Sequence, residues 1–332
     1  WLEKAKEIAE QRFGNEHPDV ATSLNNLAGL YRAQGRYDEA EPLYLQDLEM
    51  SKKLLGDEHP DVATSLNDLA ALYDDQGRYD EAETLYLQAL DMRKKLLGDE
   101  HPSVATSLNN LAGLYRAQGR YDEAEPLYLQ ALDMYKKLLG DEHPDVATSL
   151  NNLAFLYNAQ GRYDEAEPFY LQSLDMRKKL LGDEHPSVAT SLNNLAGLYN
   201  NQGRYDEAEL LYLQASDMYK KLLGNEHPSV ATSLNNLAGL YRDQGRYDKA
   251  EPLYLQALDM YKKLLGDEHP DVATSLHNLA VLYDDQGRYD EAETLYLQAL
   301  DMCKKLLGDE HPHTQIIQRS YQALLEQKKK LP

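Results

Sequence analysis

The chain has 332 residues and a formal net charge of −22, because 56 acidic residues outnumber 34 lysines and arginines. Nucleic-acid binding needs many basic side chains to neutralise phosphates, so this composition argues against a nucleic-acid partner. No apolar run approaches the roughly 20 residues of a spanning helix, and there is no signal-peptide pattern, so we expect a cytoplasmic chain without a membrane partner. The single Cys303 excludes an intramolecular disulfide.

Nearly all of the length is one 42-residue unit in tandem, marked by a His-Pro pair that recurs from His17 to His311. Such a fixed period is the signature of a repeat array. We expect seven complete units over residues 14–307. Residues 1–13 are expected to be the second helix of a preceding, truncated repeat, and residues 308–332 a polar capping helix and tail. Because the chain begins with Trp1 and not Met, we expect it to be part of a longer protein.

The third unit, residues 98–139, illustrates the secondary structure that each repeat predicts. Its sequence indicates helices over about 102–117 and about 121–138, joined by a Gln-Gly-Arg turn. Pro102 suits the first helical position, where its missing N–H has no partner to lose, and His101 then becomes the predicted N-cap. One such pair of helices cannot enclose its own apolar faces, but a stack of pairs can.

The apolar residues of this unit carry a family resemblance. They read Leu108-x2-Leu111-Ala112-x2-Tyr115 in the first helix and Ala124-x3-Tyr128 in the second. This pattern resembles a tetratricopeptide repeat, and the 42-residue form with LGDEHP and LNNLA looks like the repeats of kinesin light chains and their bacterial relatives. Over residues 14–307, the resemblance implies an all-α, right-handed superhelical solenoid. It also implies a non-enzymatic protein-interaction module that binds an extended peptide or protein segment in a concave groove.

Pairs of polar residues recur on the side of each first helix opposite its apolar face. A carboxamide both donates and accepts hydrogen bonds, so a ladder of them can bind an extended backbone whatever its side chains. Alternatively, one Asn of each pair bonds the backbone of the adjacent helix. The predicted ladder consists of Asn25, Asn26, Asn67, Asn109, Asn110, Asn151, Asn152, Asn193, Asn194, Asn235, Asn236, His277 and Asn278.

Positions that vary between otherwise similar units are expected to give selectivity. Near the end of the first helix the units carry, in order, Arg32, Asp74, Arg116, Asn158, Asn200, Arg242 and Asp284. The arginines are predicted to bind carboxylates of a partner, or else to be solvated or paired with neighbouring acids. The pairs Asp74-Asp75 and Asp284-Asp285 either receive basic residues or only aid solubility.

Phe155 stands where the other units have Gly, Ala or Val. Because binding hot spots favour large buried side chains, Phe155 is a predicted anchor. The alternative is that it packs against the next first helix.

Other functions find less support in the sequence. Each Asp/Asn-Glu-His-Pro loop has one His, and successive loops are a hairpin apart, so we expect helix capping there and no metal site. No nucleophile with a base and no phosphate-binding loop is recognisable, so we expect neither catalysis nor a cofactor.

Two alternatives to a simple binding module remain. One is the C-terminal sensor or oligomerisation arm of a larger bacterial signalling protein with an N-terminal NTPase or protease-like domain. The other is a scaffold that self-associates through an open N-terminal face. The acidic residues concentrate in the second and seventh units, so a basic partner segment is expected to favour the ends of the groove.

Overall fold

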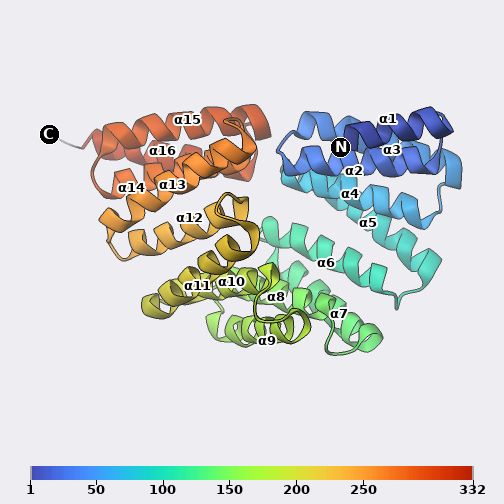
Figure 1. The fold of residues 1–332 in the computed structure, drawn as a ribbon, viewed down its shortest axis with the longest axis horizontal. Coiled ribbons are helices and arrows are strands. Elements are labelled where there is room, and N and C mark those ends of the chain that lie inside the picture. The colour runs from blue at the N-terminus through green and yellow to red at the C-terminus, as the bar shows by residue number, and fades with distance from the viewer. Residues whose placement is uncertain (1, 331–332) are drawn as a thin grey trace. The chain divides into compact units, whose positions relative to one another are not determined.

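The structure is a computed structural model that describes residues 2–330. This range contains sixteen α-helices and no strand, which confirms the predicted all-α fold, and the helices follow one another as pairs (Figure 1). Their bounds are α1 Leu2–Phe13, α2 Pro18–Ala33, α3 Tyr37–Leu55, α4 Pro60–Asp75, α5 Tyr79–Leu97, α6 Pro102–Ala117, α7 Tyr121–Leu139, α8 Pro144–Ala159, α9 Tyr163–Leu181, α10 Pro186–Asn201, α11 Tyr205–Leu223, α12 Pro228–Asp243, α13 Tyr247–Leu265, α14 Pro270–Asp285, α15 Tyr289–Leu307 and α16 Pro312–Lys328.

The chain forms two compact units, Trp1–Leu156 and Tyr157–Pro332, and each is described by itself. Within each unit, the even-numbered helices are the first helices of the repeats and the odd-numbered helices are the second. None of the helices within residues 2–330 combines the length and the apolar character that crossing a membrane requires.

The His-Pro pair fixes where each first helix begins. In α6, the ring Nδ1 of His101 accepts the backbone N–H of Ser103 at 3.1 Å, and Pro102 occupies the first helical position. The side chain therefore satisfies one of the N–H groups that a helix start leaves without an intrahelical partner. His227 makes the same 3.1 Å contact with Ser229 at the start of α12. The predicted capping role of these histidines is confirmed.

Two glycines per repeat permit the chain reversals that the stacking requires. Gly119, between α6 and α7, has φ +74°, and Gly98, before α6, has φ +85°. These left-handed conformations cost glycine little and strain other residues. The Gly119 N–H donates to the carbonyl of Arg116 at 3.0 Å, which closes the turn and lets α7 fold back along α6.

The predicted apolar faces form the core. Leu108 and Ala112 of α6 and Ala124 and Tyr128 of α7 are each at most 2% exposed. The alanines have no exposed surface, so a larger side chain at Ala124 would overpack the space between helices. The core of each unit is therefore continuous from one repeat to the next.

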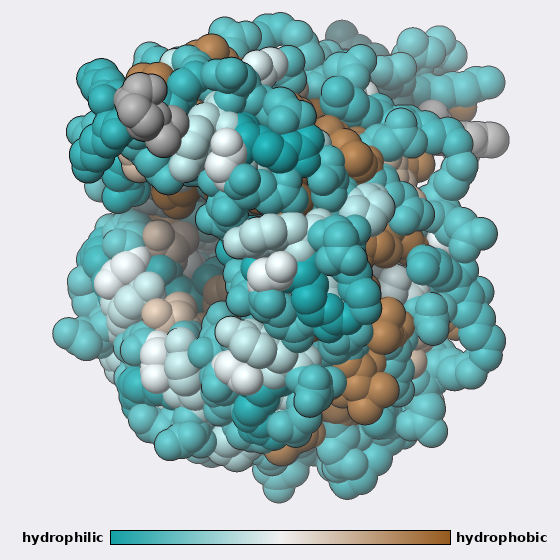
Figure 2. Space-filling view, turned by 90° about the vertical axis from the view of Figure 1, so that its left-hand side faces the viewer, coloured by the Kyte–Doolittle hydropathy of each residue, from teal (hydrophilic) through white to brown (hydrophobic). Residues whose placement is uncertain are grey.

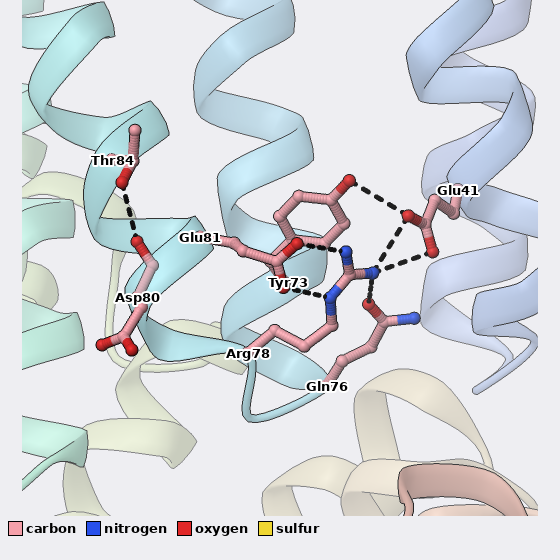
Figure 3. Close-up of polar contacts among 7 residues, drawn as sticks. All are labelled: Glu41, Tyr73, Gln76, Arg78, Asp80, Glu81 and Thr84. Atoms are coloured by element: carbon pink, nitrogen blue, oxygen red, sulfur yellow. Dashed lines mark hydrogen bonds and ion pairs between the residues drawn. The ribbon is translucent and has the colours of Figure 1, made fainter.

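An arginine in the turn of each repeat binds the preceding repeat, as Figure 3 shows for Arg78. Its Nη1 donates to Glu41 of α3 at 2.9 Å and to Gln76 at 3.0 Å, while its Nε donates to Glu81 of α5 at 2.6 Å. The guanidinium carbon lies 3.7 Å from the ring centroid of Tyr73, whose hydroxyl donates to Glu41 at 3.0 Å. We call this set of contacts the arginine clamp.

The arginine clamp recurs through both units. Its ion pairs to the preceding repeat include Arg120 with Glu83 at 2.6 Å, Arg204 with Glu167 at 2.9 Å, Arg246 with Glu209 at 2.7 Å and Arg288 with Glu251 at 2.8 Å. Each of these arginines also lies over the tyrosine ring of its own first helix. One side chain thus fixes both the turn of its own hairpin and the stacking of that hairpin on its neighbour.

We expect Arg78→Ala to lower the free energy of unfolding by about 1 to 2 kcal/mol, because it removes charge-assisted hydrogen bonds and leaves the half-buried Glu41 with only the hydroxyl of Tyr73. The measurement is urea denaturation followed by circular dichroism. The control is Lys95→Ala, which removes the ion pair of Lys95 with Glu58 within the second repeat, where both side chains are 59% exposed. Such exposed pairs contribute little to the free energy of unfolding. Equal effects of the two substitutions would therefore contradict the stabilising role of the arginine clamp.

Candidate functional site

The paired polar residues of the first helices bond to one another across neighbouring repeats. In the first unit Asn110 donates to Asn67 at 2.9 Å and Asn152 to Asn109 at 3.2 Å, and in the second unit Asn236 donates to Asn193 at 3.3 Å and Asn278 to Asn235 at 3.4 Å. Each bond joins the second Asn of one repeat to the first position of the repeat before. In these pairs the partner is therefore a side chain of the adjacent helix and not its backbone.

The remaining ladder positions have other surroundings. Asn25 donates to the carboxylates of Asp68 at 3.0 Å and Asp47 at 3.2 Å. The His277 Nε2 lies 3.2 Å from the hydroxyl of Ser320, and burial lowers the pKa of this imidazole to about 4. It is therefore neutral at pH 7. Asn26 is exposed, whereas Asn151 and Asn194 are half-buried.

A second set of cross-repeat contacts lies near the ends of the first helices, at the positions predicted to give selectivity. Its members are Arg32 with Asp75 at 2.6 Å, Asn201 with Asn158 at 3.0 Å, Asn200 with Asp243 at 2.9 Å, and Arg242 with Asp285 at 3.7 Å. Arg242 also pairs with Asp243, the next residue of its own helix, at 2.8 Å. Arg32 and Arg242 thus pair with acids of the chain itself, which was the alternative interpretation of these residues.

Arg116 and Asp74 differ because alanine replaces the residue that would pair with them. The partner of Arg32 lies 43 residues later, and the corresponding positions for Asp74 and Arg116 are Ala117 and Ala159. Neither charge therefore has this cross-repeat partner. The guanidinium of Arg116 instead lies over the ring of Phe155, 4.5 Å from its centroid.

These side chains surround a cavity of about 300 Å³ within the first unit, which we call the Phe155 cavity. Its lining comprises Asp74, Tyr86, Asn109, Asn110, Gly113, Arg116, Tyr128, Asn151, Asn152 and Phe155. Phe155 is 42% exposed, so much of its ring remains available to a partner. The volume is at the small end for ligand sites and suits a single side chain.

Two cavity residues, Tyr86 and Tyr128, come from second helices and are not among the site residues predicted from the sequence. The rings of Tyr86 and Tyr128 are buried, but both residues line the cavity. The Tyr128 hydroxyl lies 3.5 Å from the place where a side chain at Gly113 would begin. The glycine at position 113 has no side chain to cover this hydroxyl. The recurrence of glycine at this position was the only sequence signal that the tyrosines could reach this surface.

The carboxyl group of Asp74 is electrostatically unfavourable as an anion. Burial and the neighbouring negative charge of Asp75 raise its pKa to about 6, although Arg32 and Arg116 act in the opposite direction. A buried charge with incomplete compensation is destabilising, and such groups concentrate at binding sites.

The rest of the surface offers a weaker candidate. The face in Figure 2 is mainly hydrophilic with separate hydrophobic patches. Exposed leucines recur at one place on the second helices, including Leu45, Leu87 and Leu129 in the first unit. Scattered apolar residues of this kind are normal on protein surfaces, so they do not define a site.

The raised pKa of Asp74 predicts a pH-dependent contribution to stability. The folded state binds a proton more tightly than the unfolded state, so this contribution decreases as the pH rises through about 4 to 6. We expect Asp74→Asn to raise Tm at pH 7.5 and to leave it nearly unchanged near pH 4. Thermal denaturation across this range tests the prediction, with the exposed Asp80→Asn as the control. A pH profile of Asp74→Asn identical to that of the unchanged chain would contradict it.

The sequence matches the family model described as tetratricopeptide repeat in seven overlapping segments. They span residues 1–53, 20–95, 73–137, 103–179, 145–221, 187–263 and 229–305. The matches together cover most of the chain, in agreement with the resemblance in the repeat pattern. A comparison with curated proteins finds no match.

Solved structures of similar fold include two kinesin light chain-like proteins. One, from Podospora anserina, has nearly identical TPR-like repeats and is 35% identical to this chain, with a TM-score of 0.51 over 62% of this chain and 98% of that one. BtubC (BKLC) from P. vanneervenii is 25% identical, with a TM-score of 0.53 over 74% and 93%.

A Rap protein in complex with competence and sporulation factor is 14% identical, with a TM-score of 0.56 over 92% of this chain and 98% of that one, and shares the fold alone.

The repeat pattern, the family matches and the similar structures lead to one conclusion. The chain belongs to the tetratricopeptide-repeat family, whose typically non-catalytic domains generally serve as protein-interaction modules.

Proposed function

We propose that the polar face of the first helices binds an extended segment of a partner protein through hydrogen bonds from the Asn ladder to its backbone. The observation that carries this proposal is the cross-repeat bonding of the carboxamides. The bond between Asn110 and Asn67 uses one of the two N–H donors of Asn110 and one lone pair of the Asn67 oxygen. Further donor and acceptor capacity therefore lies along the face at the spacing of the repeats.

The cross-repeat bonds also favour binding through entropy. A free carboxamide loses rotamer freedom when it binds a ligand, and this loss weakens affinity. Asn110 and Asn152 are already held by their neighbours at 2.9 and 3.2 Å. A partner backbone thus meets groups that are fixed before it arrives.

The Phe155 cavity adds side-chain selectivity to this backbone recognition. The ring of Phe155 is an apolar surface for one side chain of the segment, and the guanidinium of Arg116 lies over it, 4.5 Å from its centroid. A guanidinium held beside an aromatic ring suits a carboxylate. The cavity therefore favours a segment with an apolar side chain next to an acidic one.

Loss of ladder donors is expected to weaken binding of peptides of any sequence. The probes are 15-residue synthetic peptides, selected on the intact chain from a random displayed library and measured by titration calorimetry. We expect Asn110→Ala with Asn152→Ala to weaken every selected peptide by about tenfold or more, which corresponds to about 1.4 kcal/mol, with unchanged helicity.

The matched control is Asn15→Ala with Asn225→Ala, two exposed asparagines outside the ladder. Selected peptides that bind the ladder variant as tightly as this control would overturn the backbone-binding proposal.

Phe155→Gly tests the cavity, since glycine is the residue of several other repeats at this position, such as Gly113 and Gly197. Removal of a hot-spot aromatic costs about 2 kcal/mol or more, so we expect roughly 30-fold weaker binding of peptides that place an apolar side chain there. Leu129→Ala removes a similarly exposed apolar side chain from a second helix and is the control. If Phe155→Gly and Leu129→Ala bind the peptides equally well, Phe155 is not an anchor.

A further inference from the structure

A second cavity of the first unit contains side chains that depart from the repeat pattern. It has a volume of about 260 Å³, lies between α2, α3 and α4, and is lined in part by Asn25, Asp47, Ser51, Ser65 and Asp68. Asp47 is 3% exposed and Ser51 is 5% exposed, so both lie at its floor. We call it the Asp47 cavity.

Ser51 is the smallest side chain at its position in any repeat. The other six repeats have Arg93, Tyr135, Arg177, Tyr219, Tyr261 and Cys303 there. The tyrosines fill the space and bond to a threonine of the first helix, as in the 2.7 Å contact of Tyr135 with Thr106. In the first repeat, serine leaves the space as a cavity.

Two other repeats show which group this space accepts. Arg93, which is 8% exposed, donates from Nη1 to the hydroxyl of Ser107 at 2.7 Å and to the carbonyl of Ser103 at 3.3 Å. Arg177 makes the same two contacts with Ser191 and Ser187, at 2.8 and 3.2 Å. The fold therefore holds a guanidinium at this place through one serine hydroxyl and one backbone carbonyl.

The Asp47 cavity retains both acceptors of the guanidinium and adds negative charge. Ser65 and Asp61, which line it, stand where Ser107 and Ser103 stand for Arg93. Asp47 replaces the alanine of the second repeat, Ala89, and Asp68 replaces Asn110.

The two carboxylates share the amide of Asn25, which donates to Asp68 at 3.0 Å and to Asp47 at 3.2 Å. Burial raises the pKa of the Asp47 carboxyl group, as does the charge of Asp68, although hydrogen bonds from Ser65, Asn25 and Ser51 act in the opposite direction. A cation in the cavity would compensate both charges.

We propose that the Asp47 cavity receives one arginine side chain of the bound protein segment. The proposal rests on the proposed peptide-binding function, since the rim of the cavity includes Asn26 of the ladder together with the exposed Thr22 and Thr64. A guanidinium presents several N–H donors in one plane, so it can bond the carboxylates and the serine hydroxyl together, whereas an ammonium is a point charge.

The first experiment uses blocked arginine, N-acetyl-arginine amide, as the probe, with the neutral isostere N-acetyl-citrulline amide and with blocked lysine for comparison. Binding to the intact chain is followed by amide chemical-shift changes. We expect blocked arginine to bind at least tenfold more tightly than either comparison compound and to shift the amides of Ser51 and Ser65. Equal binding of citrulline or of lysine overturns the proposal.

Two variants separate occupancy of the cavity from effects on folding. Asp47→Ala restores the residue of five other repeats and should weaken blocked arginine by about tenfold without loss of Tm. Ser51→Arg supplies the arginine from within the chain, so it should raise Tm and abolish binding of the probe. The control is Asp91→Ala, an equal change of charge at an exposed position of α5, which should leave binding unchanged. Unaltered binding by Asp47→Ala contradicts the proposal.

Library peptides distinguish this inference from the function on which it rests. In a selected peptide that contains arginine, replacement of that arginine by citrulline should weaken binding about tenfold to the unchanged chain and not to Asp47→Ala. If peptides bind through the ladder without any such preference for arginine, the peptide-binding function stands and the arginine pocket fails. If blocked arginine binds but no peptide does, the pocket for a guanidinium stands and the peptide-binding function fails.

Discussion

The packing of consecutive repeats on one another is the constraint on which the other features of this protein depend. A single hairpin leaves its apolar faces exposed, so the helices persist only when hairpins stack. The arginine clamp ties this stacking to the turn, because Arg78 bonds Glu81 within its own hairpin and Glu41 in the preceding one. Within each unit the offset between neighbouring first helices is therefore the same from repeat to repeat, and it brings a residue beside the one 43 positions later.

This fixed offset converts differences between nearly identical repeats into local chemistry. Where both positions are polar, as for Arg32 and Asp75, the side chains bond each other and the surface is neutralised. Where alanine replaces one of them, as at Ala117 and Ala159, the charge opposite keeps no such partner. Two such charges, Asp74 and Arg116, line the Phe155 cavity. The Asp47 cavity arises from the loss of a large side chain at Ser51.

The fold could be predicted from the sequence because its determinants are local and repeated. The His101 cap and the turn at Gly119 follow from residue type and spacing, and the structure confirms the cap and places α6 and α7 at the expected bounds. The bonding of Asn110 to Asn67 could not be predicted, since the choice between a backbone and a side-chain partner depends on the distance between helices, which packing sets.

The Asp47 cavity illustrates a signal that the sequence does contain. Its floor residues lie on a second helix, whereas the positions predicted to give selectivity lie on the first helices, where a groove was expected. Alignment of the second helices alone shows an acid at Asp47 where every other repeat has alanine or serine, and a serine at Ser51 where the others are larger. Burial of a carboxylate costs free energy, and only one of the seven repeats has an acid at this position. The stacking of repeats does not require that acid.

The two cavities together constrain the order of groups in a bound segment. The Asp47 cavity is lined from α2, α3 and α4, and the Phe155 cavity from α4 to α8, so both lie in the first unit and succeed one another along the repeats. Their charges differ, because the first presents two carboxylates and the second contains both Asp74 and Arg116 beside an aromatic ring. A segment that satisfies both therefore carries its arginine toward the α2 end and its apolar residue toward the α8 end. In the proposed function the Asn ladder binds backbone without regard to sequence, so this order of side chains would also set the direction in which the segment lies.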